Sequence, residues 1–494
     1  MTRIWYSLYG RMLNRRALGQ AFWKVKSAKG AAGIDGQSVK DFAESLDSNL
    51  NSLLAELQDK SYHPLAVRRV EIPKANGGVR LLGIPAVRDR VVQQALLDIL
   101  QPIFDPGFHP SSYGYRPGRS CHQAITKATM FIRQYGRKWV VDMDLSKCFD
   151  TLDHNLILSS LAKRIKDGSI LELVRNFLKS GVLTDDGWQA SEVGSPQGGV
   201  ISPLLANIYL DAFDQFMKER GHRIVRYADD ILILCSSKSA AYNALKQAGR
   251  YLEEELLLTV NREKTHVCRS WQGVKFLGVS IYSGYTQIQQ VKLNGFKAKV
   301  RTLTRRSSPN LIDVIDELNP VLAGFAMYYR IANCKGVLAD LARWVRRRIR
   351  AIQMKLWKKP TRLHRRLRQL GYTGEFKAIK MNSWANAASP LAHYALPNNH
   401  LHKELWLFDL SAVTTGILVP DENKNRQEPY TRPVRTVDQR QLFFPLNDNY
   451  ISRHSSPLLS LYTMLDNPSC YDVILFHPPG RREPVGRPET GRTP

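Results

Sequence analysis

Two adjacent carboxylates interrupt a strand-like apolar stretch near the middle of the chain. The sequence Tyr227-Ala228-Asp229-Asp230 is preceded by Ile224 and Val225 and followed by the apolar run 231–234. The flanks predict two strands, so the acids fall at or near a hairpin turn. A buried carboxylate without a partner is costly, and magnesium, which prefers oxygen ligands, is a suitable counter-ion. A solvated turn, in which Asp-Asp is also common, is the alternative interpretation.

The composition favours a polyanionic partner. The 494 residues include 71 Lys and Arg against 44 Asp and Glu, a formal net charge of +27, which points to nucleic acid ahead of a membrane surface. No apolar run approaches the roughly 18 residues of a membrane span, and the N-terminus lacks a signal-peptide core. The six cysteines are scattered without a Cys-x-x-Cys pair. We therefore expect a reduced, cytoplasmic protein with neither a zinc site nor disulfides.

The order of predicted elements favours an α+β fold. Strands and helices mix without a steady alternation, which argues against a doubly wound sheet. Beyond residue 290 the pattern becomes helical and strongly cationic. The apolar stripe of one helix comprises Leu338, Leu341, Val345, Ile349, Ile352 and Leu356. The cations off this stripe are predicted to bind a phosphate backbone, with a solvated helix face as the alternative; they are Arg343, Arg346, Arg347, Arg350 and Lys355.

A second carboxylate precedes the first pair. The apolar segment 139–143 predicts a strand that ends at Asp144. If this strand lies beside the predicted hairpin, Asp144 and Asp229 could hold two magnesium ions. Two metals about 4 Å apart stabilise the attacking and leaving oxygens of an in-line phosphoryl displacement. Taken alone, Asp144 has a helix N-cap as its default interpretation.

Two further features suit a phosphate ligand. Strands are predicted over 66–72 and 79–84, and Asn76-Gly77-Gly78 between them is a strong hairpin signal. Lys74 and Arg80 lie on opposite arms, where they could fold over a triphosphate, although exposed hairpins often carry such cations. The loop 194–199 is rich in glycine, which permits close backbone approach, and its Gln197 could pack against a base. A purely structural loop is the alternative.

In this order, the four features resemble a reverse transcriptase. The neighbouring sequences are similar to those of bacterial group II intron-encoded proteins, the reverse transcriptase–maturases. The similar segments are Ile72-Pro-Lys-Ala-Asn-Gly-Gly-Val-Arg80, Leu82-Gly-Ile-Pro85, Asp89-Arg90, Tyr113-Gly-Tyr-Arg-Pro-Gly-Arg119, Pro203-Leu-Leu-Ala-Asn-Ile208, Leu258-Thr-Val-Asn-Arg-Glu-Lys-Thr265 and Phe276-Leu-Gly278. They cover about the first three-fifths of the chain.

The resemblance implies a catalytic site. Asp144, Asp229 and Asp230 match the catalytic carboxylates, with Asp144 and Asp229 as the main ligands of two Mg²⁺ ions. Residues that match nucleotide contacts are Lys74 and Arg80 for the triphosphate, Phe149 for selection of deoxynucleotides, Gln197 beside the incoming nucleotide and Lys264 as a proton donor on the pyrophosphate side. A ring at Phe149 would exclude the 2′-hydroxyl that distinguishes RNA. Phe276-Leu277-Gly278 matches the primer grip, and ordinary strand core is the alternative for this trio.

The resemblance also implies a right-hand polymerase fold of fingers, palm and thumb, followed by a basic helical maturase domain. We expect an N-terminal extension over 1–60, fingers and palm over 61–285, a thumb over 286–358 and a maturase domain over 359–410. The match around Trp384 and Ser389-Pro390-Leu391 is loose. Residues 411–494 form a tail of unknown role that is predicted to be partly disordered. Its Cys and His residues are too few and too widely spaced for the C-terminal nuclease of some relatives.

The expected function follows from this resemblance. The protein would be an RNA-directed DNA polymerase that copies intron RNA during retrohoming and assists intron splicing. Its partners would be intron RNA as template, a DNA primer and target DNA, and deoxynucleoside triphosphates, in the bacterial cytoplasm at the nucleoid and without a membrane. Two alternatives are an intron-free reverse transcriptase in DNA repair or phage defence, and a non-catalytic RNA-binding splicing factor. The three intact carboxylates argue against the second.

Overall fold

The computed structural model describes residues 3–73, 79–184, 187–189, 193–195, 198–307 and 310–416. Lys74, Gln197 and residues 417–494 lie outside the described residues, as does the side chain of Arg80. The predictions made for these positions therefore stay predictions. None of the described helices is long and apolar enough to span a membrane.

A four-stranded antiparallel sheet, here called the palm sheet, lies between two hydrophobic clusters. Its order is β6-β7-β3-β8, with bounds β3 Trp139–Met143, β6 Arg223–Tyr227, β7 Asp230–Cys235 and β8 His266–Arg269. Successive side chains alternate between two faces. One face packs with α8 (Ser202–Glu219) and α9 (Lys238–Arg250), and the other packs with α5 (Cys121–Arg133). Both faces are covered, which explains the apolar runs 140–141, 224–225 and 231–234, whereas Asp142 and Arg226 are charged residues within these strands.

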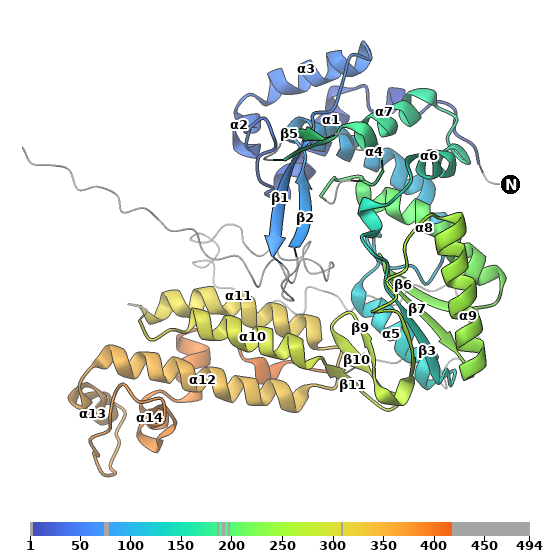
Figure 1. Ribbon diagram of the computed structural model, residues 1–494. Helices are drawn as coiled ribbons and strands as arrows, with labels where there is room; N and C mark the ends of the chain where they lie inside the picture. The colour runs from blue at the N-terminus through green and yellow to red at the C-terminus, as the bar shows by residue number, and fades with distance from the viewer. Residues whose placement is uncertain are drawn as a thin grey trace, which may run out of the picture.

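The N-terminal part combines helices with a second sheet of order β2-β1-β4-β5. The predicted cationic hairpin is confirmed: β1 (Val67–Pro73) and β2 (Val79–Ile84) pair antiparallel, with Pro73 opposite Val79. The strands β4 (Val182–Thr184) and β5 (Gly187–Gln189) extend the sheet. In Figure 1 the β1–β2 hairpin projects downward from a group of helices at the top, namely α1 (Arg15–Ser27), α2 (Val39–Glu44), α3 (Leu46–Gln58), α4 (Val87–Phe104), α6 (His154–Ala162) and α7 (Gly168–Lys179).

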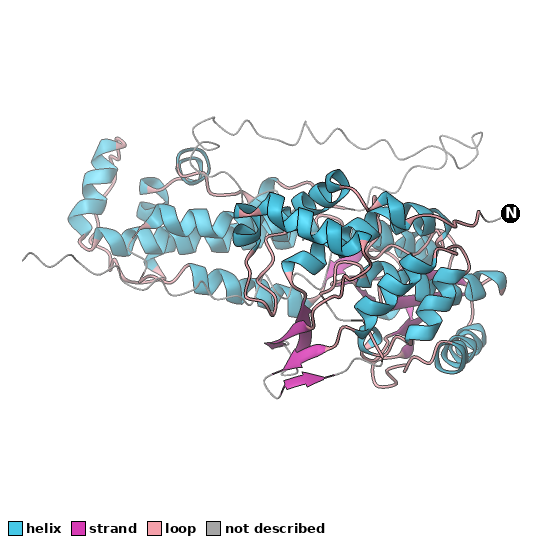
Figure 2. Cartoon of the chain, turned by 90° about the horizontal axis from the view of Figure 1, so that it is seen from above, coloured by secondary structure: helices cyan, strands magenta, loops and turns pink. Residues whose placement is uncertain are grey.

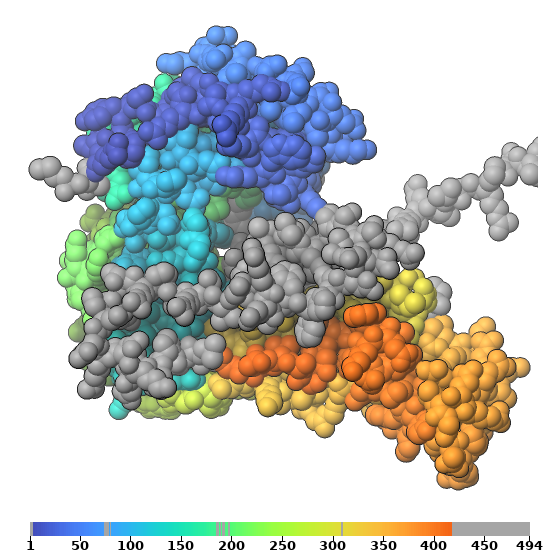
Figure 3. Space-filling view, turned by 180° about the vertical axis from the view of Figure 1, so that it is seen from behind, coloured from blue at the N-terminus to red at the C-terminus, as the bar shows by residue number. Residues whose placement is uncertain are grey.

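A small sheet joins the palm sheet to a helical arm. Its strands are β9 (Val274–Phe276), β10 (Val279–Ile281) and β11 (Thr286–Ile288). The arm contains α10 (Gln290–Leu303), α11 (Leu311–Tyr329), α12 (Lys335–Trp357), α13 (Pro360–Gln369) and α14 (Pro390–Ala395). The predicted apolar stripe lies on α12, where five of its six residues are buried and Leu356 is half-buried. Figure 2 shows the helical arm extending away from the part of the molecule that contains the strands. In Figure 3 the light-orange residues of α13 and α14 form the far end of the arm.

Short 3₁₀ or π turns complete the described structure, at Tyr9–Arg11, Asp105–Gly107, Cys148–Asp150, Tyr251–Glu255, Ser270–Gln272, Asn386–Ala388, His400–Glu404 and Leu410–Ala412. Three hydrophobic clusters hold the elements together. The first joins the N-terminal helices to one face of the palm sheet, and the second joins the other face to β9–β11 and α10–α12. The third is small and lies between the end of α12, α13 and α14. The mixture of helices and sheets confirms the predicted α+β class.

Candidate active site

The adjacent carboxylates lie at the tip of a β-hairpin. Tyr227 pairs with Asp230, so Ala228 and Asp229 are the two turn residues between β6 and β7. This confirms the hairpin that the sequence predicts. Ala228 has a φ of +56°, a left-handed conformation that is uncommon for a residue with a β-carbon. The surrounding contacts must therefore hold the turn in place.

Asp144 lies at the same end of the palm sheet. The strand β3 is the direct neighbour of β7, and Met143 at its end pairs with Ile231. Asp144, the next residue, therefore emerges beside Asp230. The juxtaposition that the two sequence patterns predict is thus confirmed, although the roles of the three acids remain predictions.

Asp144 is hydrogen-bonded to the loop that follows α9. Its Oδ2 accepts hydrogen bonds from Lys264 Nζ and Asn261 Nδ2, both at 3.1 Å. The backbone of Asp144 joins the same loop, since its carbonyl accepts from Asn261 N at 2.9 Å and its N–H donates to Thr265 Oγ1 at 3.2 Å. Lys264 therefore reaches the site as expected. The sequence analysis missed Asn261 and Thr265, although both belong to the family-like segment 258–265.

The carboxylates influence one another's protonation. Desolvation by the surrounding protein, followed by the charges of Asp229, Asp144 and Asp142, raises the pKa of Asp230 to about 8. Asp230 is nevertheless exposed on one side, so water screens part of this effect. Desolvation, with a contribution from Asp144, also raises the pKa of Asp142 to about 6. Asp142 was missed, but its spacing of two from Asp144 on a strand places both on one face.

The carboxylate oxygens of this site are of the kind that magnesium prefers as ligands. Among the described residues, no three His, Cys, Asp or Glu side chains already form a metal-binding group. Magnesium is usually bound by one or two carboxylates together with phosphates and water, not by a complete protein cage. Asp144 and Asp229 therefore fit a site that substrate phosphates complete.

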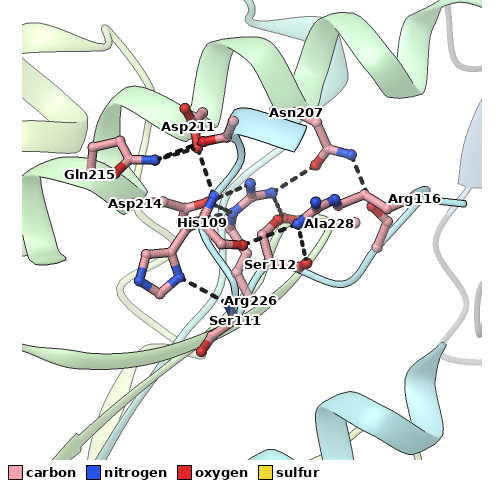
Figure 4. A network of polar contacts seen from close by, with 12 residues as sticks. His109, Ser111, Ser112, Arg116, Asn207, Asp211, Asp214, Gln215, Arg226 and Ala228 are labelled. Atoms are coloured by element: carbon pink, nitrogen blue, oxygen red, sulfur yellow. Dashed lines mark hydrogen bonds and ion pairs between the residues drawn. The ribbon is translucent and has the colours of Figure 1, made fainter. Parts of the chain in front are cut away.

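A buried network supports the hairpin tip (Figure 4). Arg226, the residue before Tyr227, is fully buried and forms an ion pair with Asp214 of α8. Its Nη1 donates to the carbonyl oxygen of Ala228 and to Asn207 Oδ1, both at 3.0 Å. Asn207 Nδ2 in turn donates to the carbonyl of Gly114 at 2.8 Å. The sequence offered no signal for this network except a charged residue within an apolar strand.

Phe149 lies beside the glycine-rich loop. Its carbonyl accepts a hydrogen bond from Ser195 N at 2.7 Å, and its half-buried ring meets Tyr115 edge-on at 6.1 Å between centroids. A β-carbon on Gly194 would lie 2.7 Å from the carbonyl of Asp150, and one on Gly198 would lie 2.4 Å from that of Gly83. The close backbone approach predicted for these glycines is thus made to the protein's own chain, which brings β2 and the Phe149 segment together.

The predicted primer-grip residues form the turn between β9 and β10. Phe276 pairs with Val279, and Leu277 and Gly278 both have positive φ. Tyr328 Oη donates to the carbonyl of Leu277 at 2.9 Å. Phe276 and Leu277 are buried in the second cluster. The trio therefore anchors the small sheet on α11, and its contact with a primer remains a prediction.

Of the five cations of α12 that were predicted to bind nucleic acid, three are exposed and two are covered by other parts of the chain. Arg343, Arg347 and Lys355 are exposed. Arg350, in contrast, is only 2% exposed and donates to the carbonyl of Leu396 at 2.9 Å and to Asn398 Oδ1 at 2.8 Å. Arg346 is largely covered too, and its Nη1 lies 3.6 Å from Asp409 Oδ1. The prediction that Arg350 and Arg346 belong to an open cationic face was wrong, because the segment 396–409 covers that side of the helix.

Comparison with known proteins agrees with this geometry. A family described as "Reverse transcriptase (RNA-dependent DNA polymerase)" matches residues 72–281, and "Group II intron, maturase-specific domain" matches residues 293–371. Protein YkfC of Escherichia coli is 36% identical over 300 residues, which cover 53% of this chain and 79% of YkfC. Group II intron-encoded protein LtrA of Lactococcus lactis is 30% identical over 364 residues, which cover 60% of this chain and 59% of LtrA. The first match spans the palm sheet and its carboxylates, and the second runs from within α10 to just beyond α13.

Proposed function

The chain belongs to the family of group II intron reverse transcriptase–maturases, and from this premise we propose that it is an RNA-directed DNA polymerase. It would copy intron RNA into DNA during retrohoming and assist splicing of the intron. The observation that carries the proposal is the meeting of Asp144 with the Asp229–Asp230 turn at one end of the palm sheet. These carboxylates lie within the reverse transcriptase match, and the basic arm carries the maturase match.

The residues of the site have distinct proposed tasks. Asp144 and Asp229 would hold magnesium, which supplies the positive charge that stabilises the attacking and leaving oxygens of an in-line displacement. Asp230 completes the acidic cluster. The ammonium group of Lys264 lies 3.1 Å from Asp144 Oδ2; in this proposal it would neutralise a phosphate and give a proton to the departing pyrophosphate. Phe149 would exclude the 2′-hydroxyl of a ribonucleotide.

The arm supplies the proposed surface for intron RNA. Between Asp340 and Glu375 the sequence contains no acidic residue. The exposed cations of this stretch are Arg343, Arg347, Lys355, Lys358, Lys359, Arg362, Arg365 and Arg368. Cations this dense repel one another unless an anion lies between them, and a phosphate backbone supplies regularly spaced anions. The DNA primer and target DNA would place the protein at the bacterial nucleoid.

Primer extension tests the proposal. The full chain is given a DNA primer annealed to an RNA template, with magnesium and deoxynucleoside triphosphates. Wild type should make template-length DNA, and Asp229→Ala should make none while its affinity for RNA stays unchanged. Asp98→Ala removes a surface carboxylate that pairs with Lys24 far from the hairpin and should retain synthesis. Tight RNA binding without any DNA product from wild type would instead favour a non-catalytic splicing factor.

A further inference from the structure

A fully buried ion pair lies beneath the hairpin that carries Asp229. Arg226 and Asp214 are both 0% exposed. Arg226 Nε donates to both carboxylate oxygens at 2.9 Å, and Nη2 donates to Oδ2 at 2.6 Å. Removing two charges from water is costly, and apolar side chains of similar size often stabilise a core equally well. What this pair contributes must therefore lie in the geometry that it imposes.

The guanidinium also fixes the turn itself. Its Nη1 donates to the carbonyl oxygen of Ala228 at 3.0 Å. That oxygen belongs to the planar peptide group that also contains the nitrogen of Asp229. The hydrogen bond therefore sets the orientation of the peptide from which the Asp229 side chain projects. The residue it contacts, Ala228, has the unusual φ of +56°.

The other side of the turn is closed by the protein backbone. A β-carbon on Gly114 would lie 2.3 Å from the backbone nitrogen of Ala228, so only glycine permits this approach. Asn207 connects the two sides, because its Oδ1 accepts from Arg226 and its Nδ2 donates to the Gly114 carbonyl. Figure 4 shows Asn207 between Arg226 and the neighbouring loop. The turn is thus enclosed by an ion pair, an amide and a glycine.

We propose that Arg226, Asp214 and Asn207 form a positioning network that orients the Ala228–Asp229 peptide and thereby sets the affinity of Asp229 for a divalent cation. The inference rests on the proposed function. Arg226 is wholly buried and does not touch substrate, so it is a positioning residue and acts through Asp229. Residues that orient a metal ligand typically change metal affinity or activity by about 10- to 100-fold when they are replaced.

The decisive variant is Arg226→Met/Asp214→Leu in the full chain, which replaces the ion pair by apolar side chains of similar size. We expect the variant to fold with a lower melting temperature, because the Ala228 carbonyl and Asn207 Oδ1 lose their buried donor. RNA affinity should be unchanged, and Mn²⁺ binding should be weakened about 10-fold or more. Mn²⁺, which binds carboxylates as Mg²⁺ does, is followed by electron paramagnetic resonance without nucleic acid. The kcat of primer extension should fall as well. Wild-type Mn²⁺ affinity in a folded double variant would overturn the proposal.

Two further variants complete the test. Arg226→Lys keeps the charge but loses the fork of donors, so it should show the same weakened Mn²⁺ binding, and it decides the question if the double variant does not fold. Arg88→Met/Glu56→Leu removes an ion pair of the N-terminal part and should leave Mn²⁺ binding unchanged. If wild type binds Mn²⁺ but makes no DNA, the proposed polymerase function fails, whereas the binding comparison still tests the network.

Discussion

Asp89 is a buried acid outside the candidate site that ties the segment before β1 to α4. Its Oδ1 accepts from Tyr62 Oη at 2.6 Å, and its Oδ2 accepts from Leu65 N at 3.0 Å. Burial raises the pKa of Asp89 to about 6, although both hydrogen bonds act in the opposite direction. A single side chain thus makes the stability of this region depend on pH.

Replacing Asp89 should remove this dependence. The folded chain keeps the proton up to about pH 6, whereas the unfolded chain loses it near pH 3.9. The stabilising contribution is therefore complete below about pH 4 and is lost as the pH rises to 6. Relative to wild type, the free energy of unfolding of Asp89→Asn should increase by about 2–3 kcal/mol between pH 4 and pH 7, as measured by urea unfolding. A difference that stays constant with pH would contradict this.

Tyr62→Phe provides the matched control for Asp89. The hydroxyl of Tyr62 donates a hydrogen bond that lowers the pKa of Asp89. Its removal should move the loss of stability to a higher pH, without abolishing it. An unchanged pH window would mean that Asp89 is not the titrating group.

Sequence patterns located the acids of the site but not their supports. Short apolar runs place Asp144 at a strand end and Asp229 in the turn between two strands, because such runs depend only on the local sequence. The partner of Arg226 is Asp214, on a different element. Their contact depends on how α8 packs on β6, and no local pattern contains that information. Asp142 could have been found, because its spacing from Asp144 on a strand is visible in the sequence.

At the scale of the element, α12 shows which buried residues helical periodicity can predict and which it cannot. The apolar stripe was predicted correctly, but the helix is covered on a second side by the segment 396–409. Arg350 extends its guanidinium to the Leu396 carbonyl and to Asn398 there. The periodicity of apolar residues identifies the face of a helix that is buried. It does not show that Arg350 is also buried, because its hydrogen-bond acceptors belong to a segment about 50 residues further along the chain.

Arg347 and Arg350, three positions apart on α12, should respond in opposite ways to replacement. Arg347 is exposed, although its Nε donates to the carbonyl of Trp384 at 3.2 Å. Arg347→Ala should therefore lower the melting temperature only slightly, and it should reduce the salt dependence of RNA binding by about one unit of slope because the exposed guanidinium can contact a phosphate. Arg350→Ala should lower the melting temperature, since it removes buried hydrogen bonds, and leave the slope unchanged. The measurements are filter binding at several salt concentrations and thermal unfolding. If Arg350→Ala reduced the salt dependence of RNA binding and Arg347→Ala did not, Arg350 and not Arg347 would be the residue that contacts RNA.

At the scale of the whole molecule, we expect DNA synthesis and RNA binding to depend on different hydrophobic clusters. The carboxylates lie at one end of the palm sheet, and this sheet lies between the first and second clusters. The exposed cations around α13 depend on the third, small cluster, which contains Leu363 and Leu367. Figure 1 shows α13 and α14 at the end of the arm, beyond α12. Damage to the third cluster should therefore stay local.

Leu367→Ala tests this separation. The side chain of Leu367 is fully buried, and its truncation should cost about 2–5 kcal/mol in a cluster that has few residues to compensate. We expect weaker binding of intron RNA, because α13 loosens and its arginines lose their fixed spacing, while extension of a short DNA primer on a short RNA template continues. Leu232→Ala, in the palm sheet, should impair primer extension. Equal loss of both activities in Leu367→Ala would show that the arm and the palm sheet unfold together, and that the hairpin carrying Asp229 depends on the far end of the molecule.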